Sequence, residues 1–346
     1  MTDRRPLLAV TLGDPGGVGP EIAAKALALK GVYEICRPLI IGTVDLIKNA
    51  LAFSGIEGIS VAPLADPAQG RYGHGQIEVL EAGNFSLSEL KHKTVTAAQG
   101  RVSFEFVAKA IELALAGQVD GTVTGPINKA AINAAGFHYS GHTEIYAEKT
   151  ATRDYAMMLA DGNFRVSHVS THVSLREACQ RAKKDRIAKV IDLTAQALRR
   201  LGLGDPKIAV AGLNPHCGED GLFGTEDDLE VRPAVAESKA AGLSVEGPIP
   251  ADTVFSKMLG GQYDAVVAMY HDQGHIPTKL VGFKYDQNEK AWGKLSGVNV
   301  TLGLPIVRTS VDHGTAFGKA GEGRANPQSL IEAIAMAAQL AAPPKT

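Results

Sequence analysis

Cysteine, tryptophan and long apolar runs are scarce in this chain of 346 residues. It has three cysteines and one tryptophan, and aromatic residues make up only 5%. Three scattered cysteines without a Cys-x-x-Cys spacing exclude a disulfide framework. No apolar run approaches the ~20 residues that cross a bilayer, and the chain starts without the apolar segment of a signal peptide. We therefore expect a cytoplasmic protein that does not bind a membrane.

An excess of charge of either sign is also missing. The chain has 35 Lys and Arg against 37 Asp and Glu, a formal net charge of −2. Proteins that bind nucleic acids or anionic membranes need a basic surface that releases counterions. We therefore expect this protein to bind neither. Apolar residues make up 45% and charged residues 21%, which is typical of a folded globular protein.

Short apolar runs alternate with longer amphipathic stretches along the whole chain. Because aromatic residues are few, alanine, valine, leucine and isoleucine must build the core. Strands are predicted at Pro6–Leu12, Arg37–Gly42, Gly121–Val123, Arg165–Ser170, Lys207–Ala211 and Asp264–Met269. Helices are predicted at Glu21–Leu29, Val44–Phe53, Ala97–Ala116 and Asp185–Leu201. This alternation predicts an α/β protein with a mostly parallel sheet. The length suits about two domains, and because no linker segment separates them, we expect two lobes that share strands.

Three histidines follow apolar runs at corresponding points. His172, His216 and His271 each stand where a predicted strand gives way to a polar turn. Ligands of open α/β sheets bind at the carboxyl ends of strands, so we expect these residues to open toward one crevice. Three imidazoles suit Zn²⁺ or a similar divalent ion with one position left for substrate. Three unrelated loop histidines are the alternative, and their spacing does not decide between the two.

Polar residues gather beside these histidines in Tyr270–Lys279, Asn214–Gly221 and Ser140–Glu144. Helix caps and turns explain their Asp, Asn, Gly and Pro residues but not the recurrence of histidine. His138 is interpreted as an ordinary polar position. The same holds for His168, although a supporting role toward His172, four residues later, stays open.

Two other features favour structural interpretations. The glycine-rich turn Gly13–Glu21 fits neither G-x-G-x-x-G nor G-x-x-x-x-G-K-[ST], so it is interpreted as a strand–helix connection, with anion binding as the alternative. Cys217 adjoins a candidate ligand, but nothing in the sequence marks a lowered thiol pKa, so a small packing residue is expected there.

Ordered motifs over nearly the whole chain resemble the 4-hydroxythreonine-4-phosphate dehydrogenase (PdxA) family. They are, in chain order, Gly13-Asp14-Pro15 through Gly19-Pro20-Glu21, Thr124-Gly125-Pro126-Ile127-Asn128-Lys129, Gly141-His142-Thr143-Glu144, Thr171-His172, Leu213-Asn214-Pro215-His216, Gly247-Pro248-Ile249-Pro250-Ala251-Asp252-Thr253, Tyr270-His271-Asp272-Gln273-Gly274, Val298-Asn299-Val300-Thr301-Leu302-Gly303-Leu304-Pro305 and Arg308-Thr309-Ser310-Val311-Asp312-His313-Gly314-Thr315-Ala316.

This resemblance implies a two-lobed α/β/α fold similar to isocitrate and isopropylmalate dehydrogenases, without a classical Rossmann fingerprint. The first lobe is expected to comprise residues 1–130 and about 286–346, and the second about 131–285, with the active site in the cleft between them. It also implies a homodimer with the active site at the subunit interface.

The resemblance assigns roles to individual residues as well. The metal ligands would be His172, His216 and His271, with one ligand from the partner subunit, for one Zn, Mg, Mn or Co ion per site. Substrate contacts would be His142, Thr143, Lys279, Asn299 and Arg308. The acid–base residues would be Lys279, Asp272 and Asp252. NAD would contact Asp312, His313, Gly314, Thr315 and Asn326.

The implied reaction is an NAD-dependent oxidative decarboxylation of a four-carbon 3-hydroxy acid 4-phosphate. The metal binds the substrate hydroxyl, hydride leaves for the nicotinamide, and carbon dioxide departs from the resulting ketone. Lys279, or Asp272 through a water, is expected to transfer the proton. The alternatives are a catalytically silent sugar-phosphate sensor and a three-histidine metal hydrolase, neither of which would bind NAD.

Two departures point to one branch of the family. The segment Lys284–Gly297 is longer than in the biosynthetic enzymes, and His275-Ile276-Pro277 replaces a shorter apolar turn. Both features are similar to D-threonate and D-erythronate 4-phosphate dehydrogenases, which give dihydroxyacetone phosphate, rather than to the enzymes of pyridoxal phosphate synthesis. The insert, which contains Trp292, is interpreted either as a lid or as a solvated loop.

Overall fold

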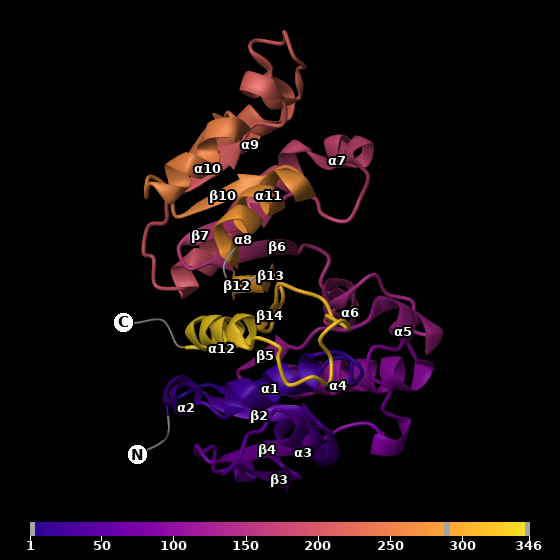
Figure 1. Cartoon of the computed structure of the whole chain (residues 1–346). Helices are drawn as coiled ribbons and strands as arrows, with labels where there is room; N and C mark the ends of the chain where they lie inside the picture. Colours follow the sequence, from indigo (N-terminus) through magenta and orange to yellow (C-terminus); the bar gives the residue numbers. More distant parts are fainter. Residues whose placement is uncertain (1–3, 287–290, 343–346) are drawn as a thin grey trace. The chain divides into compact units, whose positions relative to one another are not determined.

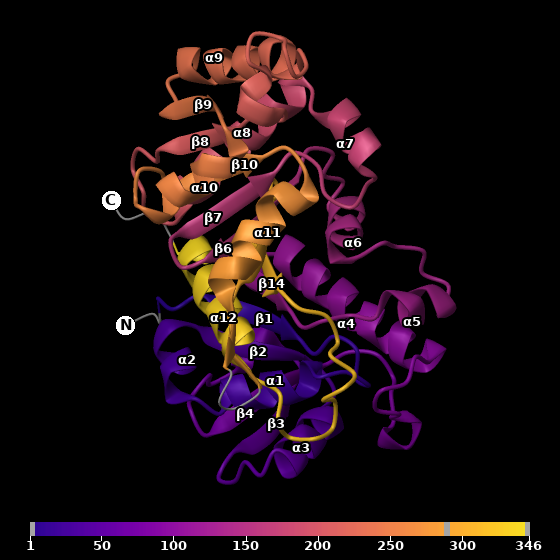
Figure 2. The same ribbon diagram turned by 45° about the horizontal axis from the view of Figure 1, so that its top comes forward.

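The computed structural model describes residues 4–286 and 291–342, which divide into two compact units (Figures 1 and 2). The first consists of Met1–Arg153 and Leu304–Pro343, and the second of Asp154–Gly303. The sequence places these boundaries near 130 and 286. Strands and helices alternate in both units, which confirms the predicted α/β class. The active-site cleft between lobes stays a prediction.

The first unit contains a sheet of parallel strands. Their order is β3-β4-β2-β1-β5-β14, and every described pair is parallel. The strands are β1 (Leu7–Thr11), β2 (Arg37–Gly42), β3 (Ser60–Leu64), β4 (Gln76–Glu81), β5 (Gly121–Thr124) and β14 (Arg308–Val311). The strands β1, β5 and β14 are buried throughout, as expected of parallel strands covered on both faces.

Helices cover both faces of this sheet. The helices are α1 (Gly19–Leu27), α2 (Lys30–Ile35), α3 (Val44–Phe53), α4 (Ala97–Leu115), α5 (Lys129–Ala134), α6 (His142–Lys149) and α12 (Gln328–Ala341). Helix α4 packs on β1, β2 and β5, while α1 packs with α2, α3 and α12. The side chains of Thr43, Thr96 and Asn128 accept backbone N–H bonds at the starts of α3, α4 and α5, as N-cap residues do.

The second unit contains a mixed sheet. Its order is β13-β6-β7-β10-β8-β9, with β6 antiparallel to both neighbours and the remaining pairs parallel. The strands are β6 (Ala156–Asp161), β7 (Phe164–His168), β8 (Ile208–Ala211), β9 (Val245–Ile249), β10 (Ala265–Ala268) and β13 (Val298–Leu302). The sequence analysis did not predict these antiparallel strands. A two-residue turn joins β6 to β7, whereas a parallel pair would require a crossover helix between them.

Helices again lie on both faces of the second sheet. The helices are α7 (Leu175–Arg181), α8 (Lys184–Arg200), α9 (Arg232–Ala240), α10 (Ala251–Leu259) and α11 (His271–Gly282). Helix α8 packs with α9. Helix α11 packs on β6, β7 and β10 (Figure 2). Val254 and Met258 of α10 pack on Val166, Ala209 and Val266 of the strands. This core fixes β7, β8 and β10, the strands that His172, His216 and His271 follow.

The insert predicted at Lys284–Gly297 includes an antiparallel hairpin. Its strands are β11 (Phe283–Asp286) and β12 (Ala291–Leu295). Residues 287–290 lie outside the described residues, so the interpretation of the insert as a lid stays a prediction. None of the helices in the described ranges is long and apolar enough to cross a membrane.

The close approach of α4 and α5 generates a stability prediction. A Cβ on Gly100 would lie 2.0 Å from the carbonyl oxygen of Ala131 in α5. Gly100→Ala should therefore lower the free energy of unfolding by about 1–3 kcal/mol, although alanine itself favours a helix over glycine by ~1 kcal/mol. Gly31→Ala in α2 is the control, because its Cβ would meet nothing within 4 Å. Urea unfolding midpoints measure both, and an unchanged midpoint for Gly100→Ala would contradict this packing.

Candidate active site

Two of the three predicted metal histidines lie together at the carboxyl edge of the second sheet. His172 follows β7, and His271 begins α11 directly after β10, the strand next to β7. Their ring centroids are 5.8 Å apart. Both residues line a cavity of about 500 Å³ together with Thr171, Tyr270 and Asp272. The cavity is placed where open α/β sheets bind their ligands.

The imidazole of His271 has a carboxylate partner. Nδ1 of His271 lies 2.6 Å from Oδ1 of Asp272, so Nδ1 donates its hydrogen to the carboxylate. Metal-binding histidines are typically held by such a carboxylate, which fixes the tautomer and the ring orientation. The sequence predicts Asp272 as an acid–base residue, and that role stays a prediction; in the structure its carboxylate accepts a hydrogen bond from His271.

The His172–His271 pair fits a divalent metal. Two imidazoles whose nitrogens lie ~2 Å from one tetrahedral ion have ring centres about 5–6 Å apart, close to the distance found here. In the described ranges, however, no group of three His, Cys, Asp or Glu side chains could hold a metal ion. The described residues of one chain thus offer two candidate ligands, and the expected ligand from a partner subunit stays a prediction.

His216 does not join the pair within one chain. It is exposed, does not line the 500 Å³ cavity, and lies 6.2 Å from the ring of Phe223. All six residues from 216 to 221 have positive φ, and four of them are not glycine. The buried carboxylate of Asp227 holds the start of this turn by accepting the backbone N–H groups of Leu213 (2.7 Å) and Asn214 (2.9 Å). The left-handed turn sets the local backbone of His216, which lies outside the lining of the His172–His271 cavity.

Cys217 in the same turn is a packing residue. It is 4% exposed and its Sγ lies against Gly212. Burial raises the pKa of the Cys217 thiol to about 11, so the thiol stays protonated at neutral pH.

A glutamine that the sequence does not single out anchors the start of α11. The side-chain oxygen of Gln273 accepts the N–H of Met269 (2.6 Å), and its nitrogen donates to the carbonyl of Gly212 (2.7 Å). Gln273 is buried, and these two hydrogen bonds connect the end of β10 to the loop after β8. Its amide places His271 relative to the neighbouring strand.

Two further histidines extend the pair into the protein. The ring of His275 stacks on His271 with centroids 3.6 Å apart, and His168 of β7 lies 4.7 Å from His275. Burial lowers the pKa of His275 to about 4 and that of His168 to about 3, and each is lowered further by a neighbouring histidine. Both rings are therefore neutral at physiological pH.

The other predicted residues of the second unit do not line the cavity of His172 and His271. Lys279 lies two turns after His271 on α11, with Nζ 4.3 Å from the ring centre of Phe283. Oδ1 of Asn299, on β13, is buried and has no hydrogen-bond partner among the described residues. Asp252 is exposed in the first turn of α10.

In the first unit the structure brings together Arg308 and His142. Arg308 of β14 is 2% exposed, and its Nη2 donates to Oγ1 of Thr124 (2.9 Å). Burial lowers the pKa of Arg308 to about 10. The pKa of His142 is held well below its ordinary value, first by burial and then by the charges of Arg308 and Lys129. Lys129, at the start of α5, is a basic residue that the sequence prediction omits.

This group of residues suits an anion. Nε2 of His142 is buried and has no partner in the part of the chain that the structure describes. Thr143 follows it in the first turn of α6, where no side chain caps the free backbone N–H groups after Gly141. Helix N-termini and guanidinium groups both bind phosphate. Glu144 is the one acidic neighbour of Arg308 in this group.

The predicted cofactor residues are a partly exposed stretch of the first unit. Asp312, His313 and Thr315 are half-buried, whereas Gly314 and Asn326 are exposed. A Cβ on Gly314 would meet nothing within 4 Å, so a ligand has room to approach the backbone there. Oδ1 of Asn326 accepts the N–H of Gln328 at the start of α12 (2.9 Å). Open backbone next to a helix start fits a dinucleotide, although the segment has no G-x-G-x-x-G turn.

The glycine-rich turn after β1 is packed instead. Residues 11–20 are all buried. A Cβ on Gly13 would lie 2.3 Å from the carbonyl oxygen of Pro126, and one on Gly17 would lie 2.9 Å from Thr315. The N–H of Val18 also donates to the carbonyl of Thr315 (3.0 Å). These glycines therefore allow the turn to pack against protein, which explains them without a bound anion.

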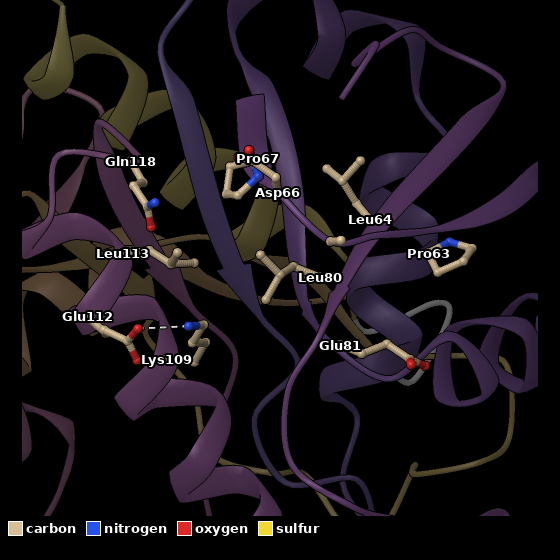
Figure 3. Close-up of a pocket in the computed structure, with 11 residues that line it drawn as sticks. Pro63, Leu64, Asp66, Pro67, Leu80, Glu81, Lys109, Glu112, Leu113 and Gln118 are labelled. Atoms are coloured by element: carbon tan, nitrogen blue, oxygen red, sulfur yellow. Dashed lines mark hydrogen bonds and ion pairs between the residues drawn. The ribbon is translucent and has the colours of Figure 1, made fainter. Parts of the chain in front are cut away.

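A second pocket lies in the first unit, near the ends of β3 and β4 (Figure 3). It has a volume of about 740 Å³. Its charged groups already have partners: Lys109 donates to Glu112 (2.8 Å), and Oδ1 of Asp66 accepts the N–H of Ala68 (2.9 Å). Histidine is absent from its lining, so the His172–His271 cavity is the stronger candidate.

The fold and the histidine site together are those of an α/β enzyme. More particularly, the chain belongs to the PdxA family: residues 34–337 match the family model described as pyridoxal phosphate biosynthetic protein PdxA. Its relatives are named dehydrogenases, so the chain is an oxidoreductase of this family.

Three relatives show the extent of the similarity. A protein of Bradyrhizobium diazoefficiens, provisionally named D-threonate 4-phosphate dehydrogenase, is 50% identical over 99% of this chain and 98% of its own. One of Symbiobacterium thermophilum with the same name is 45% identical over 98% of each chain. The crystal structure of 4-hydroxythreonine-4-phosphate dehydrogenase from Klebsiella pneumoniae is 41% identical, with a TM-score of 0.84 over 97% of this chain and 99% of that one.

The buried carboxyl of Asp14 generates a pH prediction. Burial raises its pKa from 3.8 to about 6, against the effect of a hydrogen bond from the Gly16 N–H. The folded protein thus keeps a proton that the unfolded chain loses between pH 4 and 6, so Asp14 costs stability as the pH rises through this range and by a constant amount above it. Asp14→Asn should gain up to roughly 3 kcal/mol relative to wild type between pH 4 and 6.

Urea unfolding midpoints at pH 4, 5, 6 and 7 measure this gain. The exposed Asp205→Asn is the control and should run parallel to wild type. A difference between Asp14→Asn and wild type that does not change with pH would contradict the buried, protonated carboxyl.

Proposed function

We propose that this chain is an NAD- and divalent-metal-dependent dehydrogenase that oxidises and decarboxylates a four-carbon 3-hydroxy acid 4-phosphate. D-Threonate 4-phosphate or D-erythronate 4-phosphate is the first choice of substrate, giving dihydroxyacetone phosphate and carbon dioxide. The observation that carries the proposal is the His172–His271 pair with Asp272 on Nδ1 of His271. The names of the two curated relatives support this substrate class.

His172 and His271 would hold the metal, and the exposed His216 of the partner subunit is proposed as a further ligand in a homodimer. When bound, the metal supplies Lewis acidity that lowers the pKa of a coordinated hydroxyl. Asp272 keeps the proton of His271 on Nδ1, so that Nε2 is available as a donor. The residues of this chain thereby fix the ligand geometry before the ion arrives.

The anion-binding group of the first unit is proposed to bind the substrate phosphate. Arg308 offers guanidinium N–H groups from a buried position, and His142 offers a buried ring nitrogen. Lys129 adds a positive charge close to His142. A planar guanidinium binds a phosphate through two parallel hydrogen bonds, which orients the substrate as well as attracting it.

Proton transfer is assigned to Lys279. Asp272, the other sequence candidate, is bonded to His271, whereas Lys279 is half-buried on the same helix. The stretch from Asp312 to Thr315 with Asn326 is proposed to hold NAD, which supplies the hydride acceptor when bound. Asn299 and Asp252 keep their predicted roles beside the substrate and the metal.

A coupled assay tests the function directly. NADH absorbance is followed with purified protein, NAD and Mg²⁺, Mn²⁺, Co²⁺ or Zn²⁺, offering D-threonate 4-phosphate, D-erythronate 4-phosphate and 4-phosphohydroxy-L-threonine separately. We expect turnover of a sugar-acid phosphate, and His172→Ala or His271→Ala should reduce it at least ~100-fold because a ligand is lost. His138→Ala, at an exposed histidine, is the control.

Each result has a defined meaning. Turnover of the amino acid alone would assign the protein to pyridoxal phosphate synthesis. Metal binding without NAD binding would favour the hydrolase, and binding of substrate without turnover or NAD binding would favour the sensor. Full activity of either histidine variant would overturn the metal assignment.

The phosphate assignment has its own test. Arg308→Lys keeps the charge but loses the planar guanidinium, so kcat/KM should fall at least ~10-fold, mainly through a higher KM. Arg165→Lys is a matched control, since Arg165 is also buried but belongs to the second unit, where it donates to Asn163 and to the carbonyl of Asp264. An unchanged KM for Arg308→Lys would place the phosphate elsewhere.

A further inference from the structure

Four imidazoles follow one another in the second unit, from the cavity to the interior of the sheet. Their order is His172, His271, His275 and His168, with successive ring centroids 5.8, 3.6 and 4.7 Å apart. The proposed function uses only the first two. His275 and His168 therefore need an explanation of their own.

His275 is held in a defined place on His271. The two rings are nearly parallel, with an interplanar angle of 12°. Nδ1 of His275 lies 2.9 Å from the carbonyl oxygen of His271, one turn earlier in α11, and donates to it. Since this bond fixes the His275 ring against the helix backbone, the ring forms a flat support for the imidazole of His271.

The support is backed by β7. His168 is 1% exposed, and its Nδ1 donates to the carbonyl of Met157 (3.3 Å). A Cβ on Gly274 would lie 2.3 Å from Nε2 of His168 and 2.8 Å from Val166, so only glycine lets α11 lie this close to the strand. His275 thus contacts both the ring of His271 and the buried ring of His168.

We propose that His275 is a positioning residue for His271. The stacked ring of His275 sets the tilt of the His271 imidazole, and the carboxylate of Asp272 sets its rotation. Together they leave Nε2 of His271 as the nitrogen open to the cavity beside His172. The inference rests on the proposed function, because it takes His271 to be a ligand of a divalent cation.

Fixing the His271 ring in advance should strengthen metal binding. A histidine side chain free to rotate must lose conformational entropy when it binds an ion, and a ring fixed beforehand loses less. Residues that orient a metal ligand without touching the metal typically change affinity by about 10–100-fold when they are replaced. His275 has the contacts for this role, whereas a residue that only fills space would need neither the parallel stack nor the bond to the His271 carbonyl.

The test measures Co²⁺ binding by the purified full-length protein, without substrate or NAD. His275→Leu removes the flat ring and should weaken Co²⁺ binding about 10–100-fold in calorimetry. His275→Phe keeps a flat ring of similar size and should bind within about threefold of wild type. His275→Gln keeps a polar side chain of similar length but has no ring, so it should weaken binding as Leu does. His138→Leu, at an exposed histidine outside the row, is the control.

The absorption bands of bound Co²⁺ provide a second readout. A change in ligand geometry should shift these bands in the Leu and Gln variants and restore them in the Phe variant. A loss of folding stability alone would change the thermal unfolding midpoint but not the bands of the folded protein. If Leu or Gln binds Co²⁺ as tightly as wild type with the same bands, the positioning role is overturned.

His271→Ala distinguishes failure of this inference from failure of the proposed function. If His271→Ala binds Co²⁺ like wild type, the metal site itself is wrong. If His271→Ala loses binding while His275→Leu and His275→Gln keep it unchanged, the metal site stands and only the role of His275 is wrong.

Discussion

The adjacency of β7, β10 and β8 is the constraint on which the candidate site depends. All three strands are parallel, so their carboxyl ends meet at one edge, and His172, His216 and His271 follow these ends. Buried amide and carboxylate groups then position the segments that leave this edge. Gln273 joins the start of α11 to Gly212, and Asp227 holds the backbone that leads to His216. The hydrophobic strands thus bring the chemistry to one place, and buried polar bonds determine where each side chain points.

Many helices and strands could be predicted because the spacing of apolar residues along the chain shows which face of each element is buried. The strand Arg37–Gly42 and the helix Val44–Phe53 have the predicted bounds, and Ala97–Ala116 differs from α4 by one residue. The antiparallel strands β6 and β13 could not be derived this way, because parallel and antiparallel strands buried on both faces have the same apolar pattern. Strand direction depends on the connections, and apolar spacing alone does not give them.

The candidate site was predictable in part for a related reason. The position of His172 and His271 after strands follows from the sequence, and so does their place at one edge. The left-handed turn at His216 does not, since apolar spacing does not encode it and the backbone that enters it is held by Asp227, which follows later in the chain. Asp272 illustrates a different limit: its residue type suits proton transfer and ligand support equally, and only the 2.6 Å contact with His271 shows which bond it makes.

The tautomers of the inner histidines have one more consequence. His275 and His168 each place their single proton on Nδ1, because that nitrogen faces a backbone carbonyl, and both rings are neutral. Their Nε2 atoms consequently carry lone pairs only, and two such atoms cannot form a hydrogen bond with each other. The two inner imidazoles are therefore held together by ring packing, and each is fixed to the backbone by its own Nδ1 hydrogen bond.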